Sequence, residues 1–299
     1  MTDTAAREKF NICLLEWPGP VPYFEAYREF SETVHYGLQR LGYESTFSVG
    51  QVNPDRRNII FGFQVLSPAA LDTLPDGTIL YNLEQIYGGK PLKPAYYQLT
   101  SKFTVWEYST RNYGVLQSLG TQNLELVPIG YVPEMTRIKP ADSLDIDVLF
   151  YGLLNDRRER VLRTLGSRGL KVKILTSIYG KERDRYIARA KIVLNMHLYE
   201  AQIFEAVRVS YLLANSKAVV SEFNNESDMD EGYRDAVILS PYENLVEACI
   251  ELLSDDSARQ AQEARGFAIM STRDETVYLG EALAPATVPT HPATGHRRE

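Results

Sequence analysis

Short apolar runs alternate with amphipathic stretches along most of the chain. Apolar runs bounded by Pro, Gly or polar residues predict buried strands, and apolar residues three or four positions apart predict helices. In the first half we expect strands at 10–15, 45–49, 58–64, 78–83, 103–106 and 124–127, with helices at 22–41 and 109–119. In the second half we expect strands at 146–151, 172–176, 192–195, 218–221 and 237–239, with helices at 157–167, 182–190, 201–215, 242–253 and 255–270. Because strands that alternate with helices pair in parallel, this pattern predicts a doubly wound α/β fold.

The alternation is interrupted once, near the middle of the chain. Residues 128–133 read Pro-Ile-Gly-Tyr-Val-Pro, and the polar segment 134–145 follows. A chain of 299 residues is long enough for two domains. We therefore expect two Rossmann-like domains, 1–133 and 134–280, that face each other across a cleft. The tail 281–299 is rich in Pro, Thr and Ala without periodicity, and we expect it to be disordered.

The composition is that of an ordinary globular protein, with 44% hydrophobic and 24% charged residues. The net charge of −7 argues against binding nucleic acid or an anionic membrane through a broad basic surface. The first residues lack the apolar core of a signal peptide, and no stretch has the roughly 18–20 apolar residues of a membrane span. Cys13 and Cys249 lie in apolar runs without metal or redox spacing. We therefore expect a cytoplasmic protein.

Common cofactor motifs are missing. No strand is followed by G-x-G-x-x-G, and G-x4-G-K-[S/T] does not occur, which disfavours nicotinamide, flavin and phosphoryl-transfer chemistry. The Asp-x-Asp pattern at Asp145 and Asp147 begins a strand, and linker polarity explains it. We therefore expect no cofactor and no metal site.

In the second half, polar residues gather where strands end. The strand 192–195 ends in Asn195 and is followed by His197, and the next helix carries Glu205 and Arg208. The strand 218–221 is followed by another carboxylate, Glu222. In an open α/β sheet, ligands bind at the carboxyl ends of strands and against helix N-termini. A surface ion pair is the alternative for Glu205 and Arg208, and a satisfied core histidine is the alternative for His197.

A second candidate element follows the strand 146–151. Gly152 allows close approach of a ligand to the backbone, Asn155 or Asp156 can cap the following helix, and Arg157 adds positive charge at its N-terminus. These features predict a site for phosphate oxygens, with Arg158 as the alternative arginine. An ordinary capped helix with an exposed, arginine-rich face is the alternative interpretation.

In the first half, Glu84 and Gln85 follow one predicted strand, and Glu16 and Trp17 follow another. A carboxylate at such a strand end can act as a base towards an acceptor hydroxyl, or it can stabilise an oxocarbenium-like centre. A helix cap or a loop hydrogen bond is an equally good reading of each carboxylate. We take Glu84 as a candidate catalytic residue and Glu16, Trp17 and Gln85 as acceptor-side residues; which residue is the base stays open.

Four segments resemble the glycosyltransferases of the GT-B fold and group-1 type, in the subgroup with bacterial, viral and spore-maturation-type members. The segments are 81–85 (Tyr-Asn-Leu-Glu-Gln), 127–131, 149–152 with Asn155 and Arg157, and 191–222. The likeness is strongest between residues 146 and 278. It implies a metal-independent hexosyltransferase that moves a sugar from a nucleotide-sugar donor to the hydroxyl of an acceptor. The identity of the acceptor (a glycan, a lipid, a small molecule or a modified nucleic acid) stays open, and so does the oligomeric state.

The resemblance also implies roles for single residues. Glu205 matches the second Glu of the Glu-x7-Glu pattern, which contacts the ribose of the donor. His197 stands in place of the first Glu, a departure from the pattern at the donor sugar, and we count it with Glu84 as a candidate catalytic residue. Two alternatives remain: a nucleotide-sugar epimerase of the same fold, and a non-catalytic subunit that binds nucleotide sugars.

Overall fold

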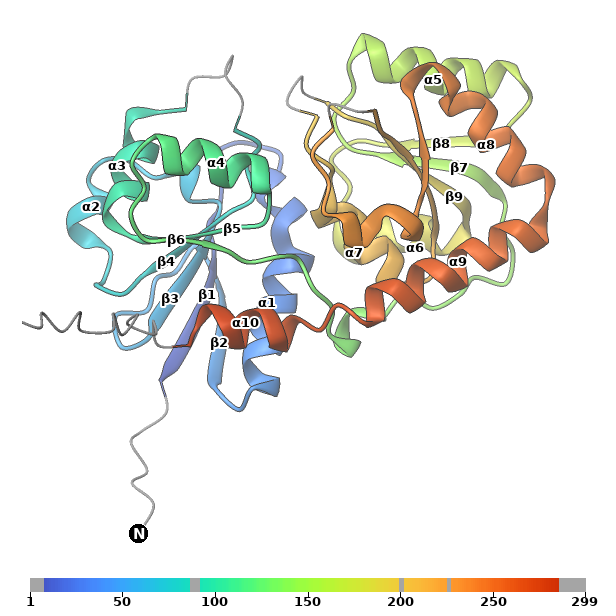
Figure 1. Cartoon of the computed structure of the whole chain (residues 1–299). Coiled ribbons are helices and arrows are strands. Elements are labelled where there is room, and N and C mark those ends of the chain that lie inside the picture. The colour runs from blue at the N-terminus through green and yellow to red at the C-terminus, as the bar shows by residue number, and fades with distance from the viewer. Residues whose placement is uncertain (1–7, 87–91, 199–201, 225–226, 285–299) are drawn as a thin grey trace, which may run out of the picture.

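Two parallel sheets, each packed against helices, form the two halves of the protein (Figure 1). The computed structural model describes residues 8–86, 92–198, 202–224 and 227–284. We call the half built on the first sheet the N-terminal domain and the half built on the second sheet the C-terminal domain. The predicted α/β class with two doubly wound, Rossmann-like domains is confirmed.

The N-terminal sheet has six parallel strands in the order β2-β1-β3-β4-β5-β6. They are β1 (Lys9–Leu14), β2 (Glu44–Val49), β3 (Arg57–Phe61), β4 (Ile79–Asn82), β5 (Thr104–Glu107) and β6 (Leu124–Leu126). In the central strand β1, Ile12 pairs with Phe47 on one side and Ile59 on the other. Every β1 residue after Lys9 is buried. A strand buried on both faces reads as a continuous apolar run, which is why it could be predicted.

The C-terminal sheet has five parallel strands in the order β11-β10-β9-β7-β8. They are β7 (Ile146–Tyr151), β8 (Val172–Leu175), β9 (Ala190–Asn195), β10 (Ala218–Glu222) and β11 (Ile238–Ser240). Because β7, β9 and β10 are neighbours, their last residues Tyr151, Asn195 and Glu222 lie along one edge of the sheet. The polar residues picked out at the ends of the second-half strands are therefore brought to one edge.

The helices follow the predicted alternation with three additions. The described α-helices are α1 (Arg28–Arg40), α2 (Ala70–Thr73), α3 (Pro94–Lys102), α4 (Thr110–Ser118), α5 (Asp156–Ser167), α6 (Gly180–Arg189), α7 (Ala206–Ala214), α8 (Leu245–Ser254), α9 (Asp256–Ser271) and α10 (Glu275–Ala282). Short 3-10 turns occur at Tyr23–Tyr27, Phe63–Val65, Pro133–Met135, Glu231–Ala236 and Tyr242–Asn244. Helices α2, α3 and α10 were not predicted. In the part of the chain that the structure describes, no helix has the length and apolar character needed to cross a bilayer.

Helix α7 begins later than the sequence pattern suggested. The described residues 202–205 do not continue the helix, because Ile203 forms a β-bridge with Asp228 and Phe204 donates its backbone N–H to the Asp228 carbonyl at 2.8 Å. Residue 201, where the predicted helix began, lies outside the described residues. Glu205 therefore occupies the N-cap position of α7, and Arg208 lies in its first turn.

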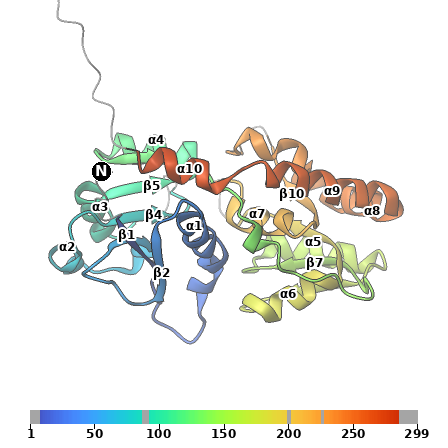
Figure 2. The same cartoon turned by 90° about the horizontal axis from the view of Figure 1, so that it is seen from below.

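The chain crosses between the domains twice, and the two crossings lie side by side. Tyr131 donates its backbone N–H to the Arg273 carbonyl at 2.6 Å, and Glu275 donates its own to the Tyr131 carbonyl at 3.1 Å. Beyond the second crossing, α10 lies against α1, on the N-terminal side of the molecule (Figure 2). The expected boundary at residue 280 assigned most of this helix to the second domain. The described part of the predicted tail, 281–284, includes the end of α10, and residues 285–299 lie outside the described residues.

At Gly130, the first crossing packs closely against the second crossing. A Cβ atom at Gly130 would lie 2.7 Å from Glu275 Oε2 and 2.8 Å from the Arg273 carbonyl oxygen, and the backbone N–H of Gly130 donates to that Glu275 oxygen at 2.8 Å. One of the opposing atoms is backbone, so the site cannot widen by rotating a side chain.

We expect Gly130→Ala to lower the free energy of unfolding by about 1–3 kcal/mol, the usual cost of forcing an extra carbon into a packed site. Gly114→Ala is the matched control, because a Cβ there, inside α4, meets no atom within 4 Å. That change should be neutral or stabilising, since Ala favours helices by up to about 1 kcal/mol over Gly. Urea unfolding of both variants checks this, and equal effects would contradict the packing argument.

Candidate functional site

A cleft of about 350 Å³ lies between the two domains. Its N-terminal wall comes from the loops after β1 and β4 and from the start of α1, and its C-terminal wall comes from the loops after β7 and β8 and from α6 and α7. It therefore opens at the carboxyl ends of strands from both sheets, where ligands bind in open α/β sheets. Six of the predicted site residues line it: Trp17, Glu84, Gln85, Gly152, Glu205 and Arg208.

Two arginines meet beside the turn after β7. Gly152 has φ +136°, and a Cβ atom there would lie 3.0 Å from Arg208 Nη2 and 3.8 Å from Arg158 Nη1. The absence of a side chain thus leaves backbone and two guanidinium groups facing one small space. The Arg208 guanidinium also lies over the Tyr151 ring, 5.1 Å from its centroid.

Arg158 is the buried member of this pair, with 2% of its surface exposed. It donates hydrogen bonds to the carbonyl oxygens of Leu153, at 2.7 Å, and Met196. Burial, together with the nearby positive charge of Arg208, lowers the pKa of the Arg158 guanidinium to about 10. The nearest carboxylate oxygen, on Glu205, is 3.8 Å away. The two cations are therefore packed close together, and an anionic ligand would relieve their repulsion.

Glu205 and Arg208 do not form the direct ion pair that was the alternative reading of their spacing. Asn195 stands between them: its Nδ2 donates to Glu205 Oε2 at 2.9 Å, and its Oδ1 accepts from Arg208 Nη1 at 2.9 Å. Burial raises the pKa of the Glu205 carboxyl, but His197, Arg208 and Asn195 together lower it below its ordinary value. Glu205 is therefore an ionised acceptor at neutral pH.

His197 lies behind Glu205 and is not among the residues that line the cleft. It is 3% exposed, and its Nδ1 is 3.3 Å from Glu205 Oε2. On its other side, Nε2 is 3.3 Å from the Ser227 hydroxyl. This placement does not support the predicted direct contact between His197 and the donor sugar. It favours a role in which His197 orients the Glu205 carboxylate.

Arg157 and Glu222 are engaged with each other away from the cleft. Arg157 Nη1 donates to Glu222 Oε2 at 2.7 Å, and its guanidinium lies 3.8 Å from the centroid of the Tyr242 ring. Glu222 Oε2 also accepts the backbone N–H of His197 at 3.0 Å. Asn155 caps α5 through the backbone N–H of Arg158, as predicted. The arginine that faces the cleft is therefore Arg158, the alternative, rather than Arg157.

The N-terminal wall places Glu84 in the cleft, where its carboxylate Oε1 accepts hydrogen bonds from the Tyr27 hydroxyl at 2.8 Å and the Gln64 amide at 2.9 Å. Gln85 reaches across the cleft and donates to the Ile203 carbonyl at 3.0 Å. Trp17 lines the cleft, whereas Glu16 is exposed and does not. Gln85 thus connects the domains in addition to lining the site.

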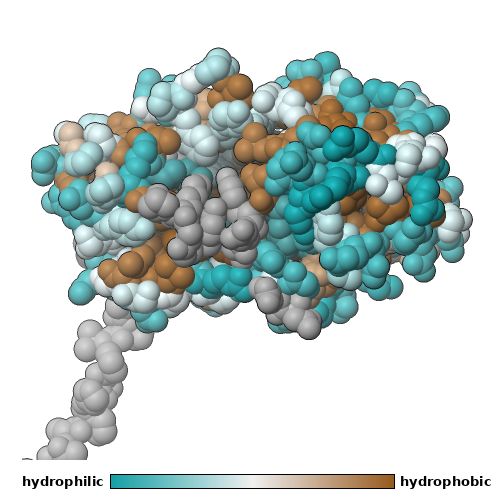
Figure 3. Space-filling view, turned by 90° about the horizontal axis from the view of Figure 1, so that it is seen from above, coloured by the Kyte–Doolittle hydropathy of each residue, from teal (hydrophilic) through white to brown (hydrophobic). Residues whose placement is uncertain are grey.

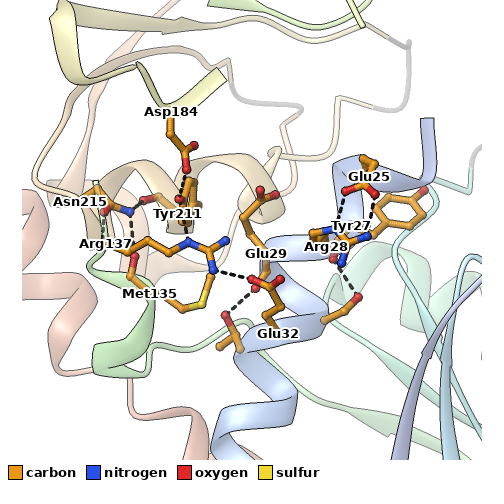
Figure 4. A network of polar contacts seen from close by, with 12 residues as sticks. Glu25, Tyr27, Arg28, Glu29, Glu32, Met135, Arg137, Asp184, Tyr211 and Asn215 are labelled. Atoms are coloured by element: carbon orange, nitrogen blue, oxygen red, sulfur yellow. Dashed lines mark hydrogen bonds and ion pairs between the residues drawn. The ribbon is translucent and has the colours of Figure 1, made fainter. Parts of the chain in front are cut away.

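Buried ionic contacts hold the two domains together on one side of the cleft. Arg183, from α6, donates to Glu29 Oε1 of α1 at 2.6 Å, and both side chains are buried. Figure 4 shows the neighbouring network, in which Arg137 donates to Glu32 at 2.5 Å and to the Tyr211 hydroxyl at 3.1 Å. The sequence analysis missed these residues, because Arg183 and Glu29 lie 154 residues apart.

A second set of contacts joins the domains on the other side. The Asp228 carboxylate accepts hydrogen bonds from the hydroxyls of Ser109, at 2.6 Å, and Thr110, at 2.9 Å, at the N-terminus of α4. Asp228 and Asp230 also form an Asp-x-Asp sequence, but Asp230 is paired with Arg273. In the described ranges, no three His, Cys, Asp or Glu side chains come together as metal ligands would.

Sequence comparison identifies distant viral relatives. No family model matches the sequence. Two sequence relatives are uncharacterized proteins of Acanthamoeba polyphaga mimivirus: R358 is 24% identical over 247 residues, 79% of this chain and 85% of R358, and L140 is 26% identical over 190 residues. The match to L140 covers 59% of each chain.

Solved glycosyltransferase structures resemble the whole chain. HepE of Anabaena, in complex with UDP and glucose, has a TM-score of 0.61 at 9% identity over 93% of this chain and 99% of HepE. WaaG, a glycosyltransferase involved in lipopolysaccharide biosynthesis, has a TM-score of 0.56 at 13% identity over 91% of this chain and 98% of WaaG. The chain therefore has the GT-B fold that the sequence predicted.

Two buried carboxyl groups outside the cleft lining give the stability a pH dependence. Burial raises the pKa of both Glu107 and Glu275 to about 8, although Glu107 accepts a hydrogen bond from Asn82 at 2.6 Å and Glu275 accepts one from Gly130 at 2.8 Å. Between the ordinary pKa of 4.5 and about 8, the folded protein therefore keeps protons that the unfolded chain releases.

We expect the free energy of unfolding to fall as the pH rises from 5 to 8, by up to about 1.4 kcal/mol per pH unit for each of these carboxyls. The double variant Glu107→Gln/Glu275→Gln should show a flatter dependence, and Glu125→Gln, at an exposed position of β6, should keep the wild-type slope. Urea unfolding at a series of pH values tests this. A double variant with the wild-type slope would contradict the assignment.

Proposed function

We propose that this chain is a glycosyltransferase that moves a sugar from a nucleotide-sugar donor to an acceptor hydroxyl. The observation that carries the proposal is the grouping of Arg158, Arg208, Gly152 and Glu205 at the carboxyl end of the C-terminal sheet, inside a cleft closed by the other domain. The fold supports it, because HepE has been solved with UDP and with UDP-glucose. The two sequence relatives are viral, and we propose that the chain belongs to the subgroup with bacterial, viral and spore-maturation-type members.

In our proposal, the donor binds these four residues in one orientation. The diphosphate lies against Arg158 and Arg208, where the Gly152 backbone leaves room for its oxygens. The ribose hydroxyls donate to the Glu205 carboxylate, which Asn195 and His197 hold in place. The sugar, a hexose in our proposal, then points across the cleft towards the N-terminal wall.

Transfer breaks the bond between the sugar and the diphosphate, and negative charge builds up on the departing phosphate oxygen. Fixed positive charge at that position stabilises the transition state more than the bound donor. We propose that the Arg158 and Arg208 guanidiniums supply this charge and that the reaction needs no divalent metal. The free, buried thiols Cys13 and Cys249 support a cytoplasmic location.

Glu84 is the base that we propose for the acceptor. Among the carboxylates of the described residues that line the cleft, Glu29 is bound to Arg183 and Glu205 lies on the donor side. Glu84 sits on the N-terminal wall, held by Tyr27 and Gln64. It takes the proton of the attacking hydroxyl while the new bond to the sugar forms.

Arg208→Ala should weaken UDP binding by about 10- to 150-fold, the effect of losing a charged hydrogen bond worth about 1.5–3 kcal/mol. Binding of uridine should change much less, because uridine lacks the phosphates. Arg163→Ala is the control, since Arg163 is exposed on α5 and paired only loosely with Glu159 at 3.5 Å. Calorimetric titration in a buffer with chelator measures these affinities. UDP affinity that is unchanged in Arg208→Ala, or that requires a metal, would contradict the proposal.

Glu84→Gln should lower kcat by roughly 10²–10⁴-fold, the usual contribution of a general base, and leave the affinity for UDP close to that of the wild type. Glu125→Gln removes an exposed carboxylate from the same domain and should leave kcat unchanged. Product formation is measured with UDP-glucose and a panel of hydroxyl acceptors. Donor turnover of equal rate without any acceptor would instead indicate an epimerase or a hydrolase.

A further inference from the structure

Tyr108 lies where the N-terminal wall of the cleft approaches the donor side. It is the residue that follows β5, and it lines the cleft. Strands β4 and β5 are neighbours, with Asn82 opposite Glu107. Tyr108 therefore stands beside the turn after β4, which carries Glu84, at the carboxyl end of the N-terminal sheet.

Two hydrogen bonds between the domains lie close to Tyr108. The first comes from the turn after β4, where the Gln85 amide donates to the Ile203 carbonyl at 3.0 Å. The second comes from the residue after Tyr108, because the Ser109 hydroxyl donates to the Asp228 carboxylate at 2.6 Å. Asp228 in turn forms a β-bridge with Ile203. Tyr108 is thereby held against the short segment that precedes α7.

This contact brings Tyr108 close to Glu205. Besides the cleft, Tyr108 lines a cavity of about 30 Å³, whose lining includes Phe204 and Ala206, the residues on either side of Glu205. Glu205 itself lines the cleft. A side chain of the N-terminal domain therefore reaches the N-cap of α7, next to the carboxylate that we assign to the ribose.

The Tyr108 hydroxyl is not engaged within the protein. In the described ranges, no residue accepts a hydrogen bond from it. By contrast, the Tyr27 hydroxyl in the same cleft lining donates to Glu84 at 2.8 Å. The Tyr211 hydroxyl, also in that lining, donates to Asp184 at 2.8 Å. Burial and the negative charge of nearby carboxylates raise the pKa of Tyr108 well above its usual range, so its hydroxyl stays protonated and can donate to a ligand.

The surroundings of Tyr108 favour such a contact. Ile203 and Phe204, which line the small cavity together with Tyr108, are buried. In the space-filling view, hydrophobic residues of both domains lie beside the line where the domains meet (Figure 3). Where little water competes, a hydrogen bond to a ligand is electrostatically stronger.

The donor orientation in the proposed function brings the sugar towards this hydroxyl. With the diphosphate on Arg158 and Arg208 and the ribose on Glu205, the sugar points across the cleft to the N-terminal wall. His197, which the sequence pattern placed at the donor sugar, lies behind Glu205 and does not line the cleft. A contact with the sugar is therefore expected from the N-terminal domain.

From this arrangement we infer that Tyr108 binds the transferred sugar, and that its hydroxyl donates a hydrogen bond to one hydroxyl of that sugar. Tyr108 thus contributes to the choice of donor sugar, although it belongs to the domain opposite the nucleotide site. The inference rests on the proposed function, because the nucleotide must occupy the C-terminal wall for the sugar to reach Tyr108.

Calorimetric titration of the full chain with UDP, UDP-glucose, UDP-galactose and UDP-N-acetylglucosamine tests this. Tyr108→Phe removes one oxygen atom and keeps the ring. We expect its affinity for the UDP-sugar that the wild type binds most tightly to fall by roughly 2- to 13-fold, the effect of losing one uncharged hydrogen bond. Its affinity for UDP should equal that of the wild type. Tyr36→Phe is the control, since Tyr36 is a partly buried tyrosine of α1 outside the cleft lining, and it should bind every ligand as the wild type does.

Deoxy analogues of that UDP-sugar, each without one sugar hydroxyl, identify the partner of Tyr108. The analogue that lacks the partner hydroxyl should bind the wild type and Tyr108→Phe equally, because the hydrogen bond is already lost on the sugar side. The remaining analogues should still bind Tyr108→Phe more weakly than the wild type.

The inference is overturned if Tyr108→Phe binds the UDP-sugar as the wild type does, or if it loses affinity for UDP and for the UDP-sugar by the same factor. It is also overturned if every deoxy analogue still distinguishes Tyr108→Phe from the wild type. In these cases the wild type binds UDP, so the donor phosphate site stands. If the wild type does not bind UDP, the proposed function is wrong and the inference about Tyr108 is wrong with it.

Discussion

The closeness of two guanidinium groups is the constraint on which this account depends. Arg158 is buried under the turn after β7, and Arg208 reaches the same turn from α7. The loss of water and the repulsion from Arg208 lower the pKa of Arg158, and the carboxylates of Glu205 and Glu222 offset this effect only in part. A bound diphosphate would bring further negative charge to the two guanidinium groups. The strand order of the C-terminal sheet explains the location, because β7 and β9 are neighbours and end at this point.

The N-terminal domain matters because it is held at a defined position opposite this charge. The Arg183–Glu29 ion pair and the Asp228 contacts with α4 fasten the domains on two sides of the cleft, and the paired crossings at Tyr131 and Arg273 join them along the chain. Glu205 is tied to one of these contacts, because the segment before it pairs with Asp228. Donor site and domain contact are therefore connected through a few residues of backbone.

Much of this architecture could be predicted from the sequence, and the exceptions share a physical cause. Strands such as β1 and β9 are buried on both faces, so their apolar runs mark them. Gly152, Glu205 and Arg208 were found because strand and helix ends mark where polar groups meet ligands. The sequence could not decide between Arg157 and Arg158, because neighbouring residues on a helix point in different directions and only packing decides which faces inward. Arg158 lines the cleft, and Arg157 is paired with Glu222. Arg183 was missed because its partner Glu29 is remote in sequence.

A crystal structure of the protein with UDP is the most direct test of the central claim. The account predicts the diphosphate against Arg158 and Arg208 beside the Gly152 backbone, with the ribose hydroxyls on Glu205. UDP bound on the N-terminal wall, or bound elsewhere with Arg158 and Arg208 left facing solvent, would contradict it.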